Sequence, residues 1–146
     1  MVIKNNQTTV QLEIGKRILL VDDESDVCFV LKTVLRENGF VVDSYEDPFL
    51  ALKKFKADLY NLVMLDIRMP GLNGFALYEE IRRLDKKVKI CFLTAGENKS
   101  YYEVYSDIFS SLPANHFIRK PIDNEGLIKC INEIIVDETA RLKQAT

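Results

Sequence analysis

The sequence predicts an α/β fold, in which a doubly wound sheet of five parallel strands is flanked by five helices. Five short apolar segments with strand character alternate along the chain with five segments whose apolar residues recur at helical spacing. The stretches between the strands are long enough for crossover helices, and such crossovers favour parallel strands with right-handed connections. A chain of 146 residues is sufficient for one such domain.

The first half of the chain contains two predicted strands, residues 17–21 and Val41–Tyr45, each followed by a helix. Ser25 is a suitable N-cap for the first helix, and Gly39 is a suitable C′ residue at its end. Asp47-Pro48 provides a cap and a first-turn proline for the second helix. Three apolar side chains of this short helix are expected to face the core: Phe49, Leu52 and Phe55.

The second half of the chain contains three further predicted strands. They are a strand that ends at Asp66, a strand at Val88–Leu93 and a strand at His116–Arg119. A helix follows Gly74, and a longer aromatic helix is predicted over residues 98–110, before Pro113. Asp123 caps the last helix, whose apolar residues again recur at helical spacing.

The helix predicted at residues 98–110 has a wider apolar face than one sheet contact requires. One stripe, expected to be core, comprises Tyr101, Val104, Tyr105 and Ile108. Tyr102 and Phe109 fall on the flank of that stripe. Either they are sealed beneath the extended loop that follows, or they form part of a surface for a partner.

Composition and charge exclude several classes of function. The chain has 20 basic and 22 acidic residues, so its net charge of −2 gives no general attraction to nucleic acid or anionic lipid. No apolar stretch is long enough to span a bilayer, and the N-terminus lacks the apolar centre of a secretory signal. We therefore expect a cytoplasmic protein with no direct nucleic-acid or membrane partner.

The chain divides into a polar leader at residues 1–15, a domain at residues 16–137 and a C-terminal tail at residues 138–146. The tail is too short for a DNA-binding or enzymatic output domain, so a stand-alone domain is expected. Apolar and polar residues alternate over residues 10–14 of the leader. An added edge strand is therefore an open alternative there.

Reactive polar residues follow four of the five predicted strands. Asp22 and Asp23 follow the first strand, Asp66 ends the third, Thr94 follows the fourth and Lys120 follows the fifth. Open parallel sheets bind ligands at the carboxyl ends of their strands. The strand order 2-1-3-4-5 would place the first and third strands side by side and would gather the three aspartates. These residues are therefore expected to form one site.

Three carboxylates in one crevice repel each other, and a hard divalent cation such as Mg²⁺ would remove that conflict. Lys120 adds a point charge and Thr94 adds a hydroxyl, and both groups suit phosphoryl oxygens. No serine or cysteine nucleophile is paired with a base in this pattern. The remaining nucleophile is a carboxylate, which can form an aspartyl phosphate, and we assign this role to Asp66.

Four motifs together resemble the receiver domain of two-component response regulators. They are Val21-Asp22-Asp23-Glu24, Leu65-Asp66-Ile67-Arg68-Met69-Pro70-Gly71, Leu93-Thr94-Ala95 and Arg119-Lys120-Pro121, and the resemblance covers residues 16–137. It implies the flavodoxin-like sheet order 2-1-3-4-5 and phosphorylation of Asp66 by a histidine kinase or a phosphotransfer protein. It also implies a Mg²⁺ site formed by Asp22, Asp23, Asp66 and the backbone carbonyl of Arg68. Thr94 and Lys120 would bind the phosphoryl oxygens.

The resemblance also implies how phosphorylation of the domain is communicated to a downstream protein. Phe117, three residues before Lys120, matches an aromatic residue that changes rotamer when the threonine, here Thr94, moves. The face of the fourth helix, fifth strand and fifth helix would then control a downstream protein, and it is also a candidate homodimer interface. Such a domain catalyses its own phosphorylation and dephosphorylation but is not an enzyme that acts on other substrates.

Two alternatives remain open. A phosphohydrolase of the haloacid-dehalogenase type needs a second acid two positions after its nucleophile, where this chain has Arg68. A degenerate receiver would act as a phosphorylation-independent binding module, although this chain keeps the acidic pair, the acceptor and the lysine. His116 has no plausible triad and is expected to be structural. The segment between Thr94 and Lys120 is a few residues longer than in most receivers.

Overall fold

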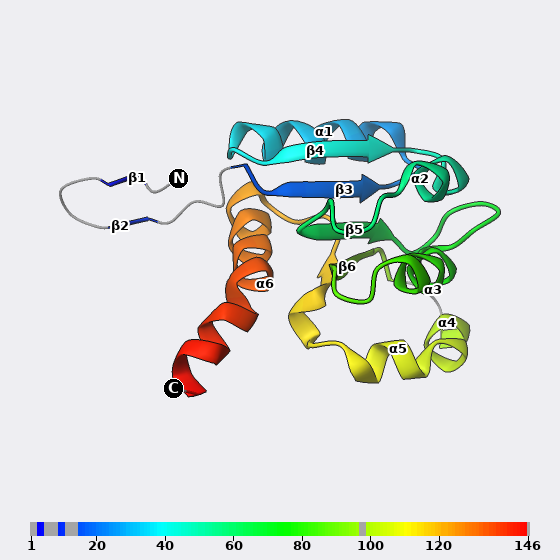
Figure 1. Ribbon diagram of the computed structural model, residues 1–146. Helices are drawn as coiled ribbons and strands as arrows, with labels where there is room; N and C mark the ends of the chain where they lie inside the picture. The colour runs from blue at the N-terminus through cyan, green and yellow to red at the C-terminus, as the bar shows by residue number, and fades with distance from the viewer. Residues whose placement is uncertain (1–2, 5–8, 11–14, 97–98, 146) are drawn as a thin grey trace.

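The computed structural model describes residues 3–4, 9–10, 15–96 and 99–145, and its centre is a five-stranded parallel sheet (Figure 1). The strands lie in the order β4-β3-β5-β6-β7, which is the predicted order 2-1-3-4-5. Their bounds are Arg17–Val21 for β3, Val41–Tyr45 for β4, Leu62–Asp66 for β5, Lys89–Thr94 for β6 and Phe117–Arg119 for β7. All neighbouring strands pair in parallel, so their carboxyl ends share one edge of the sheet.

Helices cover both faces of this sheet (Figure 1). One face packs against α1, Ser25–Glu37, and α6, Asn124–Ala145. The other face packs against α2, Pro48–Lys54, and α3, Gly74–Leu84, with the short helices α4, Lys99–Val104, and α5, Ser106–Ser111. A 3₁₀ turn, η1, Ala114–His116, leads into β7. The described part of the chain therefore has six α-helices, one more than predicted.

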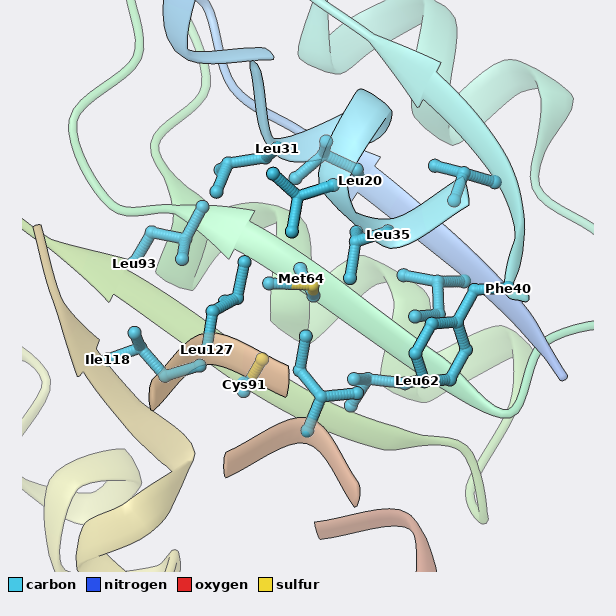
Figure 2. Packing of buried hydrophobic residues seen from close by; sticks show 14 of the residues in the cluster. Leu20, Leu31, Leu35, Phe40, Leu62, Met64, Cys91, Leu93, Ile118 and Leu127 are labelled. Carbon is cyan, nitrogen blue, oxygen red and sulfur yellow. The ribbon is translucent and has the colours of Figure 1, made fainter. Parts of the chain in front are cut away.

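Alternating strand residues fill two separate cores. In β5, Leu62 and Met64 face α1 and α6, whereas Val63 and Leu65 face α2, α3 and α5. Figure 2 shows the first core, where the strands meet apolar side chains of α1 and α6 that include Leu31, Leu35 and Leu127. All five residues of β5 are buried, as expected of a central strand in a parallel sheet. The last of them, Asp66, therefore lies at the rim of the core.

The second core contains an aromatic cluster that joins the sheet to α3, α4 and α5. Its members are Phe75, Tyr78, Phe92, Tyr101, Tyr102, Tyr105, Phe109 and Phe117. Phe75 is at the centre, with its ring centroid 4.7 Å from that of Phe92 and 4.6 Å from that of Tyr105. Offset and tilted contacts of this kind add to the stabilisation from apolar burial. The aromatic cluster therefore fixes α4 and α5 on the sheet.

The single helix predicted at residues 98–110 is interrupted at Tyr105, where the backbone leaves helical geometry at φ −111° and ψ 29°. The Tyr105 ring stacks on Phe75, and α5 begins at the next residue. The packed face changes direction at this break, so Val104, predicted as core, is 72% exposed. The rest of the predicted stripe packs on the second core: Tyr101, Tyr105 and Ile108.

The two flanking aromatic residues of this segment differ in their surroundings. Phe109 packs inside the aromatic cluster, 5.1 Å from Phe75 and 4.9 Å from Phe117. The Tyr102 ring contacts Phe109 in a tilted arrangement, with the centroids 4.5 Å apart, and remains exposed. Phe109 is therefore half-buried within the aromatic cluster, whereas Tyr102 is left on the surface.

Three smaller predictions about individual residues are wrong. Ser25, predicted as the N-cap of the first helix, is the first residue of α1, and Glu24 occupies the N-cap position without a side-chain cap hydrogen bond. Phe49, predicted to face the core, is 56% exposed, because α2 has only seven residues and other side chains fill its inner face. The Phe49 ring instead covers Gly71, where a β-carbon would lie 2.9 Å from the ring. The last strand begins at Phe117, because His116 belongs to η1. His116 is buried, with Nδ1 2.9 Å from the Ile90 carbonyl oxygen, which is a structural contact.

The two ends of the chain lie outside the main sheet. Ile3–Lys4, β1, and Thr9–Val10, β2, form a separate antiparallel pair. The edge strand considered for the leader depends on residues 11–14, which lie outside the described residues. At the other end, α6 continues through residues 138–145 of the predicted tail. Among the described helices, none combines the length and the apolar character needed to cross a membrane.

Candidate functional site

The predicted site residues lie at the carboxyl edge of the sheet. Asp66 is the last residue of β5, Asp22 and Asp23 follow β3, Thr94 ends β6 and Lys120 follows β7. β5 pairs with β3 on one side and with β6 on the other, and β7 pairs with β6. The strand order thus brings together residues from distant parts of the chain.

The three aspartates form one group of carboxylates. Asp22, Asp23 and Asp66 each offer one oxygen, and these oxygens lie within 4.8 Å of one another. Asp22 and Asp66 are almost completely buried, whereas Asp23 is half-buried. Mg²⁺ takes oxygen ligands and commonly uses one or two carboxylates while it keeps several waters. The chemistry and spacing of this donor set therefore fit a magnesium ion.

Lys120 points its ammonium group at these carboxylates. Its Nζ lies 3.1 Å from Asp22 Oδ2 and 3.4 Å from Asp66 Oδ1. A third contact of the same kind joins Nζ to Glu24 Oε1 at 3.3 Å. The peptide bond from Lys120 to Pro121 is cis. No role for Glu24 was predicted from the sequence, although it is the third acidic residue in the run after β3. That acidic run was the signal that could have identified it.

The site carries more negative than positive charge. Burial, and then the neighbouring Asp22 carboxylate, raises the pKa of Asp66 from 3.8 to about 8, although Lys120 acts in the opposite direction. Burial also raises the pKa of Asp22. For Lys120, burial lowers the pKa, but the carboxylates of Asp22 and Asp66 outweigh it, so the pKa is raised overall. A further positive charge would relieve the remaining repulsion between the carboxylates.

The loop between β5 and α3 presses against the backbone of the central aspartate. Gly74 donates its N–H to the Ile67 carbonyl oxygen at 2.8 Å. A β-carbon at Gly74 would overlap the carbonyl oxygen of Asp66 and lie 3.0 Å from its carbonyl carbon. Asn73 caps α3 through its side-chain oxygen. Arg68 lies in the same loop, two residues after Asp66, with an exposed side chain.

Thr94 and Phe117 lie on the neighbouring strands β6 and β7. The Thr94 side chain is half-buried, and its backbone carbonyl accepts a hydrogen bond from the Lys120 N–H at 2.7 Å. The Phe117 ring stacks between Phe92 at 5.5 Å and Phe109 at 4.9 Å. The structure therefore places Lys120 in direct contact with the carboxylates, joins Thr94 to Lys120 through the backbone, and holds Phe117 in the aromatic cluster.

A groove of about 480 Å³ lies beside Lys120, between α1 and the segment that follows β7. Its lining is mainly apolar and includes Val27, Val30, Leu31, Leu93, Pro121 and Ile122. Val30 is exposed on α1, next to the exposed Phe29. An apolar surface therefore adjoins the charged site.

Known proteins resemble this chain in sequence and in fold. A family model described as "Response regulator receiver domain" matches residues 18–132. The chemotaxis protein CheY of Bacillus subtilis is 32% identical over 82% of this chain and 97% of its own length. A chain in the crystal structure of histidine kinase ThkA in complex with response regulator protein TrrA is 36% identical, with a TM-score of 0.65 over 82% of this chain and 97% of that chain. A response regulator receiver domain protein from Clostridium thermocellum shares the fold at 23% identity, with a TM-score of 0.72 over 86% of this chain and 98% of that chain.

Other matching relatives are longer than this chain. The chain spans 36% of the probable transcriptional regulator ycf27 of Guillardia theta, with 39% identity over 64% of this chain. It spans 49% of the transcriptional regulatory protein RprY of Bacteroides fragilis, with 32% identity over 82% of this chain. The matched family segment contains all five strands of the main sheet except Arg17, the first residue of β3, and it contains the three aspartates of the site. The chain therefore belongs to the response regulator receiver domain family of two-component systems.

Proposed function

We propose that this chain is a phosphoacceptor in a two-component phosphorelay and that Asp66 is the residue phosphorylated. The observation that carries this proposal is the buried Asp66 carboxylate, 3.4 Å from the Lys120 ammonium and within a group of three carboxylates. A histidine kinase or a phosphotransfer protein of the cytoplasm would supply the phosphoryl group. In the transfer, an Asp66 oxygen bonds to phosphorus, the bond from phosphorus to the donor breaks, and its electron pair returns to the donor.

The neighbouring groups are suited to hold a phosphoryl group in transit. The carboxylates of Asp22, Asp23 and Asp66, with the backbone carbonyl of Arg68, would hold Mg²⁺. The ion would supply positive charge at the phosphoryl oxygens. The Lys120 ammonium and the Thr94 hydroxyl would bind phosphoryl oxygens from the other side of the site.

The groove beside Lys120 supports a protein as the phosphoryl donor. A small donor needs only the charged groups, whereas a donor protein also needs a surface on which to dock. The mainly apolar lining next to Lys120 provides such a surface. In the crystal structure of ThkA with TrrA, a histidine kinase is in complex with a response regulator protein. A histidine kinase is therefore our proposed partner.

The face formed by α4, α5, β7 and α6 is our proposed output surface. On phosphorylation, Thr94 would move toward the phosphoryl group and Phe117 would change rotamer. The aromatic cluster supports this route, because Phe117 stacks on Phe109 and Phe109 contacts the exposed Tyr102. The altered face would control a downstream protein, and it would also be the surface through which two copies pair.

Incubation with acetyl phosphate and Mg²⁺, followed by intact-mass measurement, tests the phosphoacceptor role. Wild type should gain one phosphoryl group, and Asp66→Asn should gain none because it lacks the nucleophilic oxygen. Asp107→Asn, which removes an exposed carboxylate from α5, should match wild type. Equal labelling of wild type and Asp66→Asn would refute the assignment. A wild type that gains nothing would favour the phosphorylation-independent binding module.

Arg68 should set the lifetime of the phosphoryl group. Its exposed side chain lies two residues after Asp66, at the mouth of the site, where it can shield phosphoryl oxygens from water. We expect Arg68→Ala to shorten the lifetime about twofold to tenfold, which corresponds to a lowering of the hydrolysis barrier by about 0.4–1.4 kcal/mol. Intact mass followed over time after removal of acetyl phosphate measures the lifetime, with Arg36→Ala on α1 as the control. Identical decay rates for Arg68→Ala and wild type would contradict this prediction.

A further inference from the structure

Tyr105 stands apart from the other aromatic residues of its segment because it joins two helices and also reaches the phosphoacceptor loop. It lies at the break between α4 and α5, and its ring stacks on Phe75 at 4.6 Å and 26°. Its hydroxyl oxygen accepts a hydrogen bond from Asn73 Nδ2 at 3.0 Å. The ring packing and the hydrogen bond together hold the side chain in place.

The Asn73 amide has two partners, and each requires the same orientation. Its Oδ1 accepts the backbone N–H of Ala76 at 2.9 Å, which caps α3, while its Nδ2 donates to Tyr105. A side-chain amide has a donor end and an acceptor end, so the Tyr105 hydroxyl helps to hold the capping oxygen in place. The start of α3 is therefore tied to the joint between α4 and α5.

The next residue carries this connection to the phosphoacceptor strand. Gly74 donates its N–H to the Ile67 carbonyl at 2.8 Å, and its α-carbon lies against the Asp66 backbone so closely that a β-carbon would not fit. A shift of the loop at Asn73 would therefore move the backbone of Asp66. The contacts form a continuous path: Tyr105, Asn73, Gly74, Asp66.

We infer that Tyr105 is a positioning residue for the phosphorylation of Asp66, and this inference rests on the proposed phosphoacceptor function. Through Asn73, the Tyr105 hydroxyl holds the loop that sets the position of the Asp66 carboxylate relative to Lys120 and the metal ligands. The same contacts act in the opposite direction, so a displacement of the Asp66 backbone would move the joint between α4 and α5. The position of this joint and the reactivity of Asp66 are thereby coupled.

The test uses the full chain, acetyl phosphate and saturating Mg²⁺. Tyr105→Phe keeps the ring and removes the hydroxyl. The maximal phosphorylation rate constant, measured well below the unfolding temperature, should fall about threefold to tenfold, as expected for one lost hydrogen bond. The half-saturating acetyl phosphate concentration should stay within about twofold of wild type, because Lys120 and Thr94 are untouched. A purely structural role would lower the unfolding temperature and leave the rate of the folded protein unchanged.

Two further variants make the test specific. Tyr101→Phe is the matched control: its ring lies 6.5 Å from Phe75, but within the described part of the chain its hydroxyl makes no hydrogen bond. It should match wild type. Asn73→Ser keeps a capping oxygen but cannot reach Tyr105, so it should be as slow as Tyr105→Phe, and the double variant should be no slower.

The possible outcomes separate this inference from the function on which it rests. An active wild type with an equally fast Tyr105→Phe would overturn the inference alone. A double variant whose loss is the product of the two single losses would do so as well, because independent effects multiply. A wild type that gains no phosphoryl group overturns the proposed function, and the inference with it.

Discussion

The Gly74→Ala variant should be less stable than wild type by about 2–4 kcal/mol, although alanine is the better helix former. Gly74 begins α3, and in an open helix this change would stabilise the protein by up to about 1 kcal/mol. Here the new β-carbon would overlap the Asp66 carbonyl oxygen and lie 3.0 Å from the Ile67 α-carbon. Asp66 ends a strand that is paired on both sides, so displacing its backbone costs free energy. Steric overlap therefore outweighs helix propensity.

Thermal unfolding measures this effect, and the midpoint should fall by about 4–16 °C for a chain of this size. Gly126→Ala in α6 is the matched control, because its β-carbon would meet two side chains and no backbone, with Asp123 Oδ1 at 3.0 Å and Ile122 Cγ1 at 3.5 Å. Asp123 Oδ1 also accepts the Gly126 N–H, so a small shift of this carboxylate would weaken one cap, and the control should stay within about 1 kcal/mol of wild type. Gly74→Ala should also be phosphorylated more slowly, because the overlap displaces the backbone of Asp66. A fully stable Gly74→Ala protein would mean that the loop can withdraw from β5.

The sheet and the location of the site could be predicted, because both follow from local patterns in the sequence. The strands are apolar runs between turn residues, and parallel strands share one carboxyl edge, so the residues after each run must meet there. Asp22, Asp66 and Lys120 could therefore be placed together before the structure was known. The strand order itself came from the chemistry, because only adjacent first and third strands gather the aspartates.

The features that sequence reasoning missed depend on contacts between distant residues. The break at Tyr105 arises where its ring packs on Phe75, thirty residues away by number, whereas helical periodicity continues through that position. The contact between Glu24 and Lys120 requires the bend after β3, which a motif does not describe. The need for glycine at position 74 comes from the Asp66 backbone and not from the conformation of Gly74 itself. The break at Tyr105 and the need for glycine at position 74 are tertiary constraints with no local signature, whereas the acidic run after β3 was a local signal for Glu24.

The Asp66→Asn variant should be more stable than wild type by about 1–3 kcal/mol at about pH 8 without Mg²⁺. Burial and the Asp22 carboxylate raise the pKa of Asp66 from 3.8 to about 8 in the folded protein. Between these pH values the folded protein holds a proton on Asp66 that the unfolded chain has released. The stability of wild type therefore falls as the pH rises through this range. Asparagine has no charge to bury, so the variant should lose less stability over the same range.

Mg²⁺ should narrow or reverse the stability difference between the two proteins, because an ion that binds only the folded carboxylates offsets their repulsion. At about 100 times its dissociation constant, such an ion stabilises wild type by about 2.7 kcal/mol, whereas Asp66→Asn lacks one of the carboxylates. Thermal unfolding at about pH 5 and about pH 8, with and without Mg²⁺, measures both effects. The exposed-carboxylate variant Asp107→Asn should follow wild type throughout. Equal stabilisation of wild type and Asp66→Asn by Mg²⁺ would place the ion away from Asp66. If metal-free wild type were equally stable at both pH values, the charge on Asp66 would not be destabilising in the folded protein.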